Sequence, residues 1–420
     1  MKYWMKCMCA LLALFLLSGC ASQPLAELEL VTSVPTLVPT ATPDPTPVPT
    51  PDPTPTPVPT PVPDTVITLA AVGDLMCHKY MLLDAYDKET KTYDFDSMLS
   101  DIAPYLSAAD LTIGNLETPV AGEKFGYTGS AGTLNFNAPL TYLDTLKAVG
   151  FDVLTVANNH MLDKRFEGLT NTLNTLDEYG IAHAGGYRTP QERQGTTIVE
   201  VEGIRIGFVA ATYGINSNHK SVPDEMEGLA WLDFDSEVMA QEIQKTKEAG
   251  ADFVIACMHW GYERTTSPNG TQKKMAQALA DAGADLILGH HPHVSQKVEW
   301  IESGDRKVLC FYSLSNFISN MYAPQADTGY IGYITLRQKA GQGEVTIDSA
   351  SYLPAIVYKK TYQDTSEWDF RVLPMQEFIE DEAKYESLDR AMKKRIKESY
   401  EETLKIVGDA IPVTKTYPGA

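Results

Sequence analysis

One pattern recurs three times along the chain and constrains the fold more than any other feature. In each copy, a helix-like amphipathic segment ends at a glycine, an apolar run follows, and the run ends in polar residues. The copies span residues 141–160, 242–261 and 275–293. Glycine suits the left-handed position that closes a helix, and an unbroken apolar run is typical of a strand covered on both faces. The pattern therefore predicts an α/β fold with buried parallel strands.

Other segments predict that the sheets are mixed. Residues 66–74 and 108–117 are apolar runs of the same kind, whereas residues 196–211 and 329–353 carry the turn signals of antiparallel hairpins. A helix is expected after His160, where four apolar side chains recur at helical spacing: Phe166, Leu169, Leu173 and Leu176. We therefore expect sheets built from both βα units and hairpins, flanked by helices.

The first 20 residues have the composition of a targeting segment. Two lysines precede an apolar run at residues 9–17, which is too short to cross a bilayer as a stop-transfer helix. The small residues before Cys20 resemble a bacterial lipobox, which implies cleavage at Gly19 and acylation of Cys20. We expect a lipoprotein on the extracytoplasmic face of the cell membrane. The alternative is an ordinary secretory signal with an incidental cysteine.

A proline-rich segment follows the targeting segment. Thirteen of the 26 prolines fall between Pro35 and Pro63, at nearly every second position. Proline fixes φ and removes backbone donors, so these residues favour a polyproline II spacer that reaches roughly 90 Å. The expected organisation is a lipoprotein signal peptide (1–20), a Pro/Thr-rich linker (21–64), a main domain (65–360) and a helical C-terminal extension (361–420).

The charge of the chain limits its partners. The net charge is −21 and the isoelectric point is near 4.8, which argues against nucleic acid as a partner. An anionic partner would need a local reversal of sign, which a bound cation supplies. The three cysteines beyond the linker, at positions 77, 257 and 310, each lie in an apolar stretch and are expected to be buried thiols.

Polar residues that can bind metal or carry protons follow all five apolar strands. Six of the eight histidines are among them, and only His183 and His219 lie elsewhere, where we expect surface or loop positions. The strand-end residues are Asp74 and His78, Asn115 and Glu117, Asn158 to His160, His259, and His290 to His293. Ligands bind at the carboxyl ends of strands in α/β proteins, so a shared site is expected there.

The donor types in this set indicate the kind of metal. Imidazole, carboxylate and amide oxygen without thiolate suit a borderline-to-hard divalent cation such as Mn²⁺, Fe²⁺ or Zn²⁺. Seven or eight candidate ligands are more than one tetrahedral ion requires, so the sequence predicts one or two ions. Two adjacent ions can activate water and hold both oxygens of an in-line phosphoryl displacement.

Several motifs together resemble a known family. VGDLM, GNLETP, ANNHMLD, HWGYE, GHHPHVSQ and YSLSNF occur in this order within residues 66–320. The set is similar to the capsule-synthesis (CapA-type) family associated with poly-γ-glutamate, which is similar in turn to the calcineurin-like metallophosphoesterases. The resemblance implies a metallophosphatase-like β-sandwich of two mixed sheets flanked by helices (αββα). It also implies a dinuclear centre and a role in making or exporting an anionic envelope polymer.

The resemblance also implies roles for single residues. Asp74 matches the opening metal-binding aspartate, and Asn159 matches a metal-binding asparagine. His160 matches a histidine that does not bind metal and acts as an acid or stabilises developing negative charge. His259, His291 and His293 match the remaining metal-binding histidines. We take His160 and Asp74 as the candidate catalytic residues.

Two positions depart from the phosphoesterase pattern. Met76 occupies the place of a second ligand on the first strand, and His78 replaces it only if the chain turns after Asp74. Asn115 stands where phosphoesterases have an aspartate that bridges two ions, and Glu117, two residues further on the same strand face, is the substitute. The expected metal ligands are Asp74, His78, Asn115, Glu117, Asn159, His259, His291 and His293, with His290 as a neighbour that faces the other way.

Three functions fit these features. The first is a metal-dependent, phosphoesterase-like hydrolase that acts on an envelope polymer. The second is a non-catalytic assembly factor that binds at most one cation and guides a polymer such as poly-γ-glutamate, working with membrane synthase or export subunits. The third is a polymer-binding lipoprotein with a structural metal.

Overall fold

A computed structural model describes residues 63–420, apart from 131–134, 217, 363–366 and 418–420. The predicted signal peptide, Cys20 and nearly all of the proline-rich linker lie outside the described residues. Among the residues that are described, no helix is both long and apolar enough to cross a membrane.

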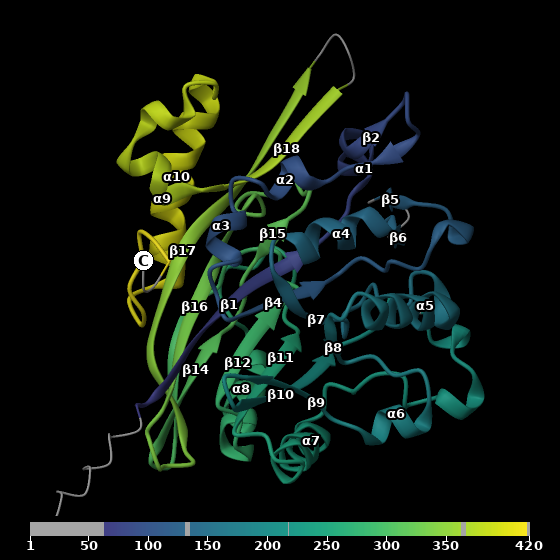
Figure 1. Cartoon of the computed structure of the whole chain (residues 1–420), viewed down its shortest axis with the longest axis vertical. Helices are drawn as coiled ribbons and strands as arrows, with labels where there is room; N and C mark the ends of the chain where they lie inside the picture. The colour runs from purple at the N-terminus through teal and green to yellow at the C-terminus, as the bar shows by residue number, and fades with distance from the viewer. Residues whose placement is uncertain (1–62, 131–134, 217, 363–366, 418–420) are drawn as a thin grey trace, which may run out of the picture. The chain divides into compact units, whose positions relative to one another are not determined.

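The first sheet has eight strands and is mixed (Figure 1). Its order is β18 (Glu367–Pro374), β17 (Val345–Tyr362), β16 (Thr328–Gln338), β1 (Thr65–Leu75), β4 (Leu111–Leu116), β7 (Phe151–Thr155) and β8 (Ala182–Ala184), with β15 (Asn316–Ile318) paired to β1. Strands β1, β4, β7 and β8 are parallel to one another, and β16 to β18 are antiparallel. The hairpin predicted at residues 329–353 is confirmed as β16 and β17.

The second sheet has six strands and is also mixed. Its order is β13 (Val298–Ser303), β14 (Arg306–Phe311), β12 (Leu286–His290), β11 (Phe253–His259), β10 (Ile204–Thr212) and β9 (Thr197–Val201). Strands β10, β11, β12 and β14 are parallel, whereas β9 and β13 pair antiparallel at the two edges. The hairpin predicted at residues 196–211 is therefore confirmed.

Helices end where the repeated pattern predicts. The helices α4 (Leu140–Ala148), α7 (Ser236–Glu248) and α8 (Gly270–Ala282) precede β7, β11 and β12. They are followed by Gly150, Gly250 and Gly283, with φ of 105°, 93° and 103°, in the region that favours glycine. The helix predicted after His160 is α5 (Arg165–Glu178), and its three leucines are buried.

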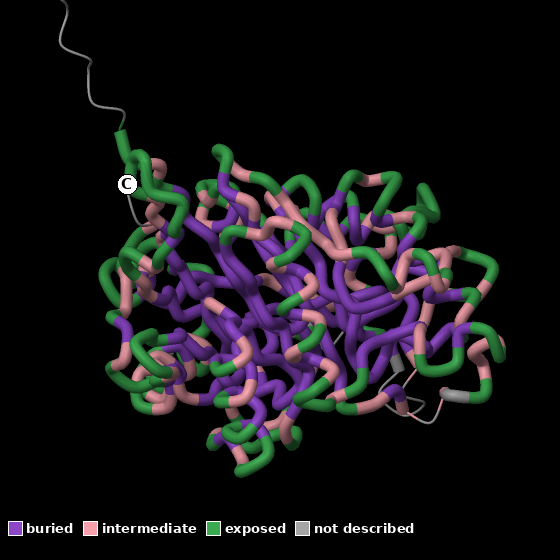
Figure 2. Tube along the Cα trace, turned by 90° about the horizontal axis from the view of Figure 1, so that it is seen from below, coloured by how far each residue is buried: buried purple, intermediate pink, exposed green. Residues whose placement is uncertain are grey.

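The two sheets pack face to face, because alternate residues of each strand point into a shared apolar layer. Leu69 of β1 and Ile255 of β11 lie in this layer. The intervening residues point outward: Ala70 packs under helices such as α4 and α5, and Ala256 under α7 and α8. Figure 2 shows buried segments in the interior, surrounded by exposed ones. This confirms the predicted class of two mixed sheets flanked by helices.

The C-terminal segment continues the first sheet and then becomes helical. The predicted domain boundary at residue 360 falls inside β17, and β18 pairs with β17 beyond it. The helices α9 (Met375–Glu380) and α10 (Arg390–Val407) follow, and Phe378 and Ile396 pack on the outer side of β17 and β18. These helices lie within residues 361–420, which were expected to be helical, whereas β18 in the same segment is a strand.

Candidate metal centre

The strand-end side chains come together from both sheets. Asp74 lies at the end of β1, and Glu117 directly follows β4 in the first sheet. His259 ends β11 in the second sheet, and His291 and His293 follow β12. All five residues are at most 3% exposed. The carboxyl ends of the parallel strands thus place carboxylates from one sheet against imidazoles from the other.

Two groups of potential metal ligands share one residue. The first group is Glu117, His259 and His291, and the second is Asp74, Glu117 and His293. Within each group, one ligand atom per residue lies within 4.8 Å of the others. Glu117 is therefore the residue that the two groups share, and a bridging role for it in place of Asn115 stays a prediction.

The Glu117 carboxylate has no hydrogen-bond partner, although it is completely buried. Its Oε1 lies 3.4 Å from Nε2 of His259, and its Oε2 lies 3.8 Å from Nδ1 of His293. Burial and the negative charge of Asp74 raise the pKa of Glu117 to about 8. Nδ1 of His291 is likewise buried without a partner. Carboxylate oxygens and imidazole nitrogens are common ligands of divalent cations such as Mn²⁺, Fe²⁺ or Zn²⁺, and here they are buried without other partners. The residues therefore fit the expected metal.

Four nitrogen atoms surround the Asp74 carboxylate. It accepts a hydrogen bond from Nδ2 of Asn115 at 2.8 Å and lies 3.1 Å from Nδ1 of His293. The backbone N–H of His291 donates at 3.3 Å, and Nδ1 of His290 lies 3.4 Å away. Burial opposes ionisation of this carboxyl, but the imidazoles of His290 and His293 hold its pKa well below the usual range. Asp74 is therefore an anion fixed in position.

The histidines of the centre differ in charge. Burial lowers the pKa of His259 well below its usual value and that of His291 to about 2, so both imidazoles are neutral and able to bind metal. His293 is also buried, but the negative charges of Glu117 and Asp74 raise its pKa to about 9. In the metal-free centre, His293 is therefore a cation that lies against the Asp74 anion.

The structure places Asn115 and Asn159 beside the ligands. Asn115 donates to Asp74, and its Nδ2 also lies 3.4 Å from Nδ1 of His259. Oδ1 of Asn159 lies 2.9 Å from Nε2 of His259. Both amides thus contact residues of the two ligand groups, and Asn159 presents an oxygen next to the first group.

His78 lies outside both ligand groups. Its Nδ1 accepts the backbone N–H of Asn320 at 3.2 Å, and its ring packs edge-on against Phe136. Burial lowers its pKa to about 3. His78, His160 and His293 instead line a cavity of about 480 Å³ beside the centre. The structure thus places this predicted ligand in the wall of a pocket.

His160 has a partner that the sequence reasoning missed. Its Nδ1 lies 2.8 Å from Oδ2 of buried Asp163, and its ring packs against Phe136. Asp163 also accepts the backbone N–H of Phe136 at 2.8 Å, which fixes the carboxylate. With Nδ1–H directed to Asp163, Nε2 is the nitrogen left for a ligand in the cavity. The His-x-x-Asp spacing in ANNHMLD was the signal available for Asp163.

The prediction that His290 faces away from the other two histidines is wrong. It shares a strand face with Leu286 and Leu288, which point between the sheets, so its ring reaches Asp74. Strand β12 ends at His290, and His291 and His293 then adopt φ of 93° and 57°. These left-handed residues bend the chain back, and all three imidazoles enter the same site.

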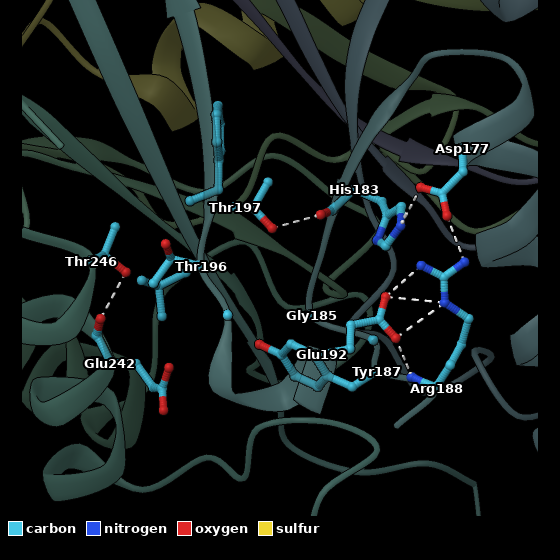
Figure 3. A pocket seen from close by; sticks show the side chains of 14 residues that line it. Asp177, His183, Gly185, Tyr187, Arg188, Glu192, Thr196, Thr197, Glu242 and Thr246 are labelled. Atoms are coloured by element: carbon cyan, nitrogen blue, oxygen red, sulfur yellow. Dashed lines mark hydrogen bonds and ion pairs between the residues drawn. The ribbon is translucent and has the colours of Figure 1, made fainter. Parts of the chain in front are cut away.

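A second cavity of about 370 Å³ is lined by none of these ligands (Figure 3). Arg188 lies between Asp177 and Glu192, with N···O distances of 2.5 Å to each. His183, expected on the surface or in a loop, lies in β8 and contacts Asp177 at 3.1 Å. Glu242 pairs with Arg193 at 2.8 Å. Each carboxylate that lines this cavity is thus paired with an arginine, in contrast to the unpaired carboxylate of Glu117 at the strand ends.

The fold and the site define an α/β sandwich with a candidate dinuclear metal centre between its sheets. The chain belongs to the family described as bacterial capsule synthesis protein PGA_cap, which matches residues 68–321. It is 30% identical over 299 residues to the PGA biosynthesis protein CapA of Bacillus subtilis, covering 70% of this chain and 75% of that protein. It is 30% identical over 257 residues to the capsule biosynthesis protein CapA of Bacillus anthracis, covering 60% and 59%. The predicted resemblance to the CapA-type family is confirmed.

Solved structures align with this chain at lower similarity. The calcineurin-like phosphoesterase YfkN from Bacillus subtilis aligns over 82% of this chain and 99% of that chain, with 16% identity and a TM-score of 0.40. A phosphatase from Mycoplasma pneumoniae aligns over 70% and 94%, with 13% identity and a TM-score of 0.43. Similarity at this level carries no functional information to this chain.

Proposed function

We propose that this protein is a metal-dependent, phosphoesterase-like hydrolase that acts on an anionic envelope polymer during capsule synthesis or export. The observation that carries the proposal is the position of Glu117 in two ligand groups with both carboxylate oxygens unsatisfied. Membership of the capsule-synthesis family supports the polymer as the target, with poly-γ-glutamate as the first candidate.

Each part of the centre has a task in this proposal. Glu117, His259 and His291 would hold one divalent ion, and Asp74, Glu117 and His293 would hold a second, with Asn159 next to the first group. When bound, the ions would lower the pKa of water and polarise the bond to be cleaved. The Nδ1 contact to Asp163 orients His160 so that, in its imidazolium form, Nε2–H gives its proton to the leaving oxygen or stabilises developing negative charge.

A non-catalytic role in guiding the polymer is the second candidate. Asn115 occupies the bridging slot of the phosphoesterase pattern, and His78 lies outside both ligand groups. A centre with a single ion would hold a polymer without cleaving it. In either case, His160 and the cavity beside the centre face the polymer.

The proposal includes a location. Acylation of Cys20 anchors the chain to the extracytoplasmic face of the cell membrane, and the Pro/Thr-rich linker separates the α/β domain from the bilayer. Synthase or export subunits in that membrane are the expected partners. The net charge of −21 disfavours nucleic acid.

One pair of measurements separates the two candidates. Metal content is measured on the purified full-length chain, and a panel of phosphoesters is then assayed with Mn²⁺ for wild type and His160→Ala. His183→Ala, in the second cavity, is the matched histidine control. Two ions per chain, with turnover lost only in His160→Ala, support the hydrolase. At most one ion, with no turnover on the panel, leaves only the guiding role.

A further inference from the structure

The cavity beside the centre opens toward a strip of aromatic and basic side chains. Tyr322 lines this cavity together with His78 and His293, yet its side chain is 70% exposed. Lys359 of β17 donates from Nζ to the carbonyl oxygen of Met321, and Nζ lies 5.1 Å from the centroid of the Tyr322 ring. Lys359 thus fixes the loop that carries Tyr322 and places a positive charge next to the exposed ring.

The strip continues across β18 to α1 (Lys79–Ala85). Lys359 is paired with Phe370 and Thr361 with Trp368, so Lys359 and Trp368 project from the same face of the sheet. A diagonal of this kind separates the two residues by roughly 7–8 Å. The Trp368 ring lies 4.1 Å from that of Tyr80, in the first turn of α1. Figure 1 shows α1 next to the β17–β18 hairpin.

Lys79 brings the strip back to the cavity. It follows His78, which lines the cavity, and its Nζ lies 6.0 Å from the Tyr80 ring. In the described part of the chain, neither Lys79 nor Lys359 forms an ion pair with a carboxylate. Burial lowers the pKa of Lys359 to about 8, so its ammonium is mostly protonated at pH 7. Two cations outside carboxylate ion pairs thus lie near the exposed rings of Tyr80 and Tyr322, with Asp327 as a negative charge near Lys359.

We infer that this strip, formed by Lys79, Tyr80, Tyr322, Lys359 and Trp368, binds an extended polymer that bears carboxylates and feeds it to the cavity beside the metal centre. The lysine ammonium groups bind carboxylates as point charges, and the rings of Tyr322, Tyr80 and Trp368 provide flat surfaces for the amide and methylene groups between them. The identity of the polymer rests on the proposed function. The strip itself rests only on the contacts of its residues.

The test measures binding without catalysis. The purified full-length chain is titrated, in EDTA, into a fluorescently labelled poly-γ-glutamate oligomer, and anisotropy is recorded. The variants are Tyr322→Ala and Lys79→Ala, which remove exposed side chains and leave the core unchanged. Lys307→Ala, at the opposite end of the strands, is the matched lysine control. We expect about a tenfold loss of affinity in each strip variant and less than a twofold change in the control.

Two further ligands test the chemistry of recognition. A fully methyl-esterified oligomer, which lacks charge, should bind at least tenfold more weakly than the acid form, and polyphosphate of similar length should bind no more tightly than poly-γ-glutamate. Equal affinity of the wild type and both strip variants would overturn the inference, as would tighter binding of polyphosphate. Binding that requires Mn²⁺ would place the polymer on the metal centre and also overturn it.

Failure here is distinguishable from failure of the proposed function. If the strip variants bind weakly but the wild type contains at most one ion and hydrolyses nothing, only the hydrolase is lost. If hydrolysis depends on His160 but the strip variants bind as well as wild type, only the strip is lost. The metal-free titration keeps the two outcomes separate.

Discussion

Oε1 of Glu117 lies 3.4 Å from Nε2 of His259, yet neither oxygen of this buried carboxylate accepts a hydrogen bond. A carboxylate left in this state costs several kcal/mol if it is ionised, because burial removes its water and nothing replaces it. A cation between Glu117 and the imidazoles removes that cost. The position of Glu117 in both ligand groups makes it the residue on which a two-ion centre depends most.

Glu117→Gln should lower the metal content from two ions per chain to at most one. The amide has no negative charge and cannot bridge two cations, while the remaining ligands of each group are unchanged. Metal content is measured by mass spectrometry on the full-length chain after equilibration with Mn²⁺. Glu263→Gln is the control, because Glu263 lines the neighbouring cavity but belongs to neither ligand group. Two ions in Glu117→Gln would contradict the shared role.

Asp163→Asn should slow hydrolysis by about 10- to 100-fold without changing the metal content. The substitution keeps the shape of the side chain but removes the carboxylate that accepts Nδ1–H of His160 and orients its ring. We therefore expect a fall in kcat with little change in KM. Loss of bound metal, or an unchanged kcat, would contradict a positioning role for Asp163.

The sequence predicts the place of the site but not all of its geometry. Parallel strands necessarily align their carboxyl ends, so a residue at each end was enough to bring Asp74, Glu117 and His259 together. His290 was predicted to face away from His291 and His293 because strand alternation was extended beyond His290, where β12 ends. The two left-handed residues that follow, His291 and His293, are not β-region residues, and alternation does not apply to them.

Contacts between segments distant in sequence could not be predicted for a different reason. His78 turns toward the backbone of Asn320, which is 242 positions away, and the strip joins α1 to β17 and β18. No local sequence pattern predicts either contact. Asp163 lies only three residues from His160 and could have been proposed as its partner. The spacing alone does not show that the two side chains meet, because this depends on the orientation of the His160 ring.

Gly73→Ala should destabilise the fold by about 2–4 kcal/mol and disorder the metal centre. A Cβ at this position would lie 1.9 Å from the backbone oxygen of Ser315, which accepts the N–H of Asp74 at 2.8 Å. The clashing atoms belong to the backbone and cannot move aside as a flexible side chain can. Strand β1 must therefore shift, and Asp74 shifts with it. Chemical denaturation measures the loss. Gly270→Ala is the control: this first residue of α8 has open space around it, so alanine should change stability by less than about 1 kcal/mol.

Cys20→Ser should release the protein from the membrane. If Cys20 is the acylated residue, serine removes the acceptor thiol, and the chain is left without a lipid. The measurement is membrane fractionation together with incorporation of a clickable fatty acid in the producing cell. Cys77→Ser is the control, because Cys77 is a buried thiol within the fold. Labelling that persists in Cys20→Ser, or loss of labelling in Cys77→Ser, would contradict the predicted anchor.

The metal-free protein should lose stability as the pH rises from about 7 to 8. The pKa of Glu117 is raised from 4.5 to about 8, so its contribution is complete below pH 4.5 and is lost as the pH rises through 8. The pKa of His293 is raised from 6.5 to about 9, so its contribution is complete below 6.5 and is lost toward 9. Three buried histidines with lowered pKa values, His78, His259 and His291, oppose this near pH 6.5 but are nearly all neutral in both states above pH 7. From about pH 7 to 8 the folded state therefore holds more protons than the unfolded chain, and stability falls by on the order of 1 kcal/mol per pH unit. Thermal unfolding in EDTA measures it. Glu117→Gln, which cannot ionise, should flatten the profile, and a melting temperature that rises across this window would refute the assignment.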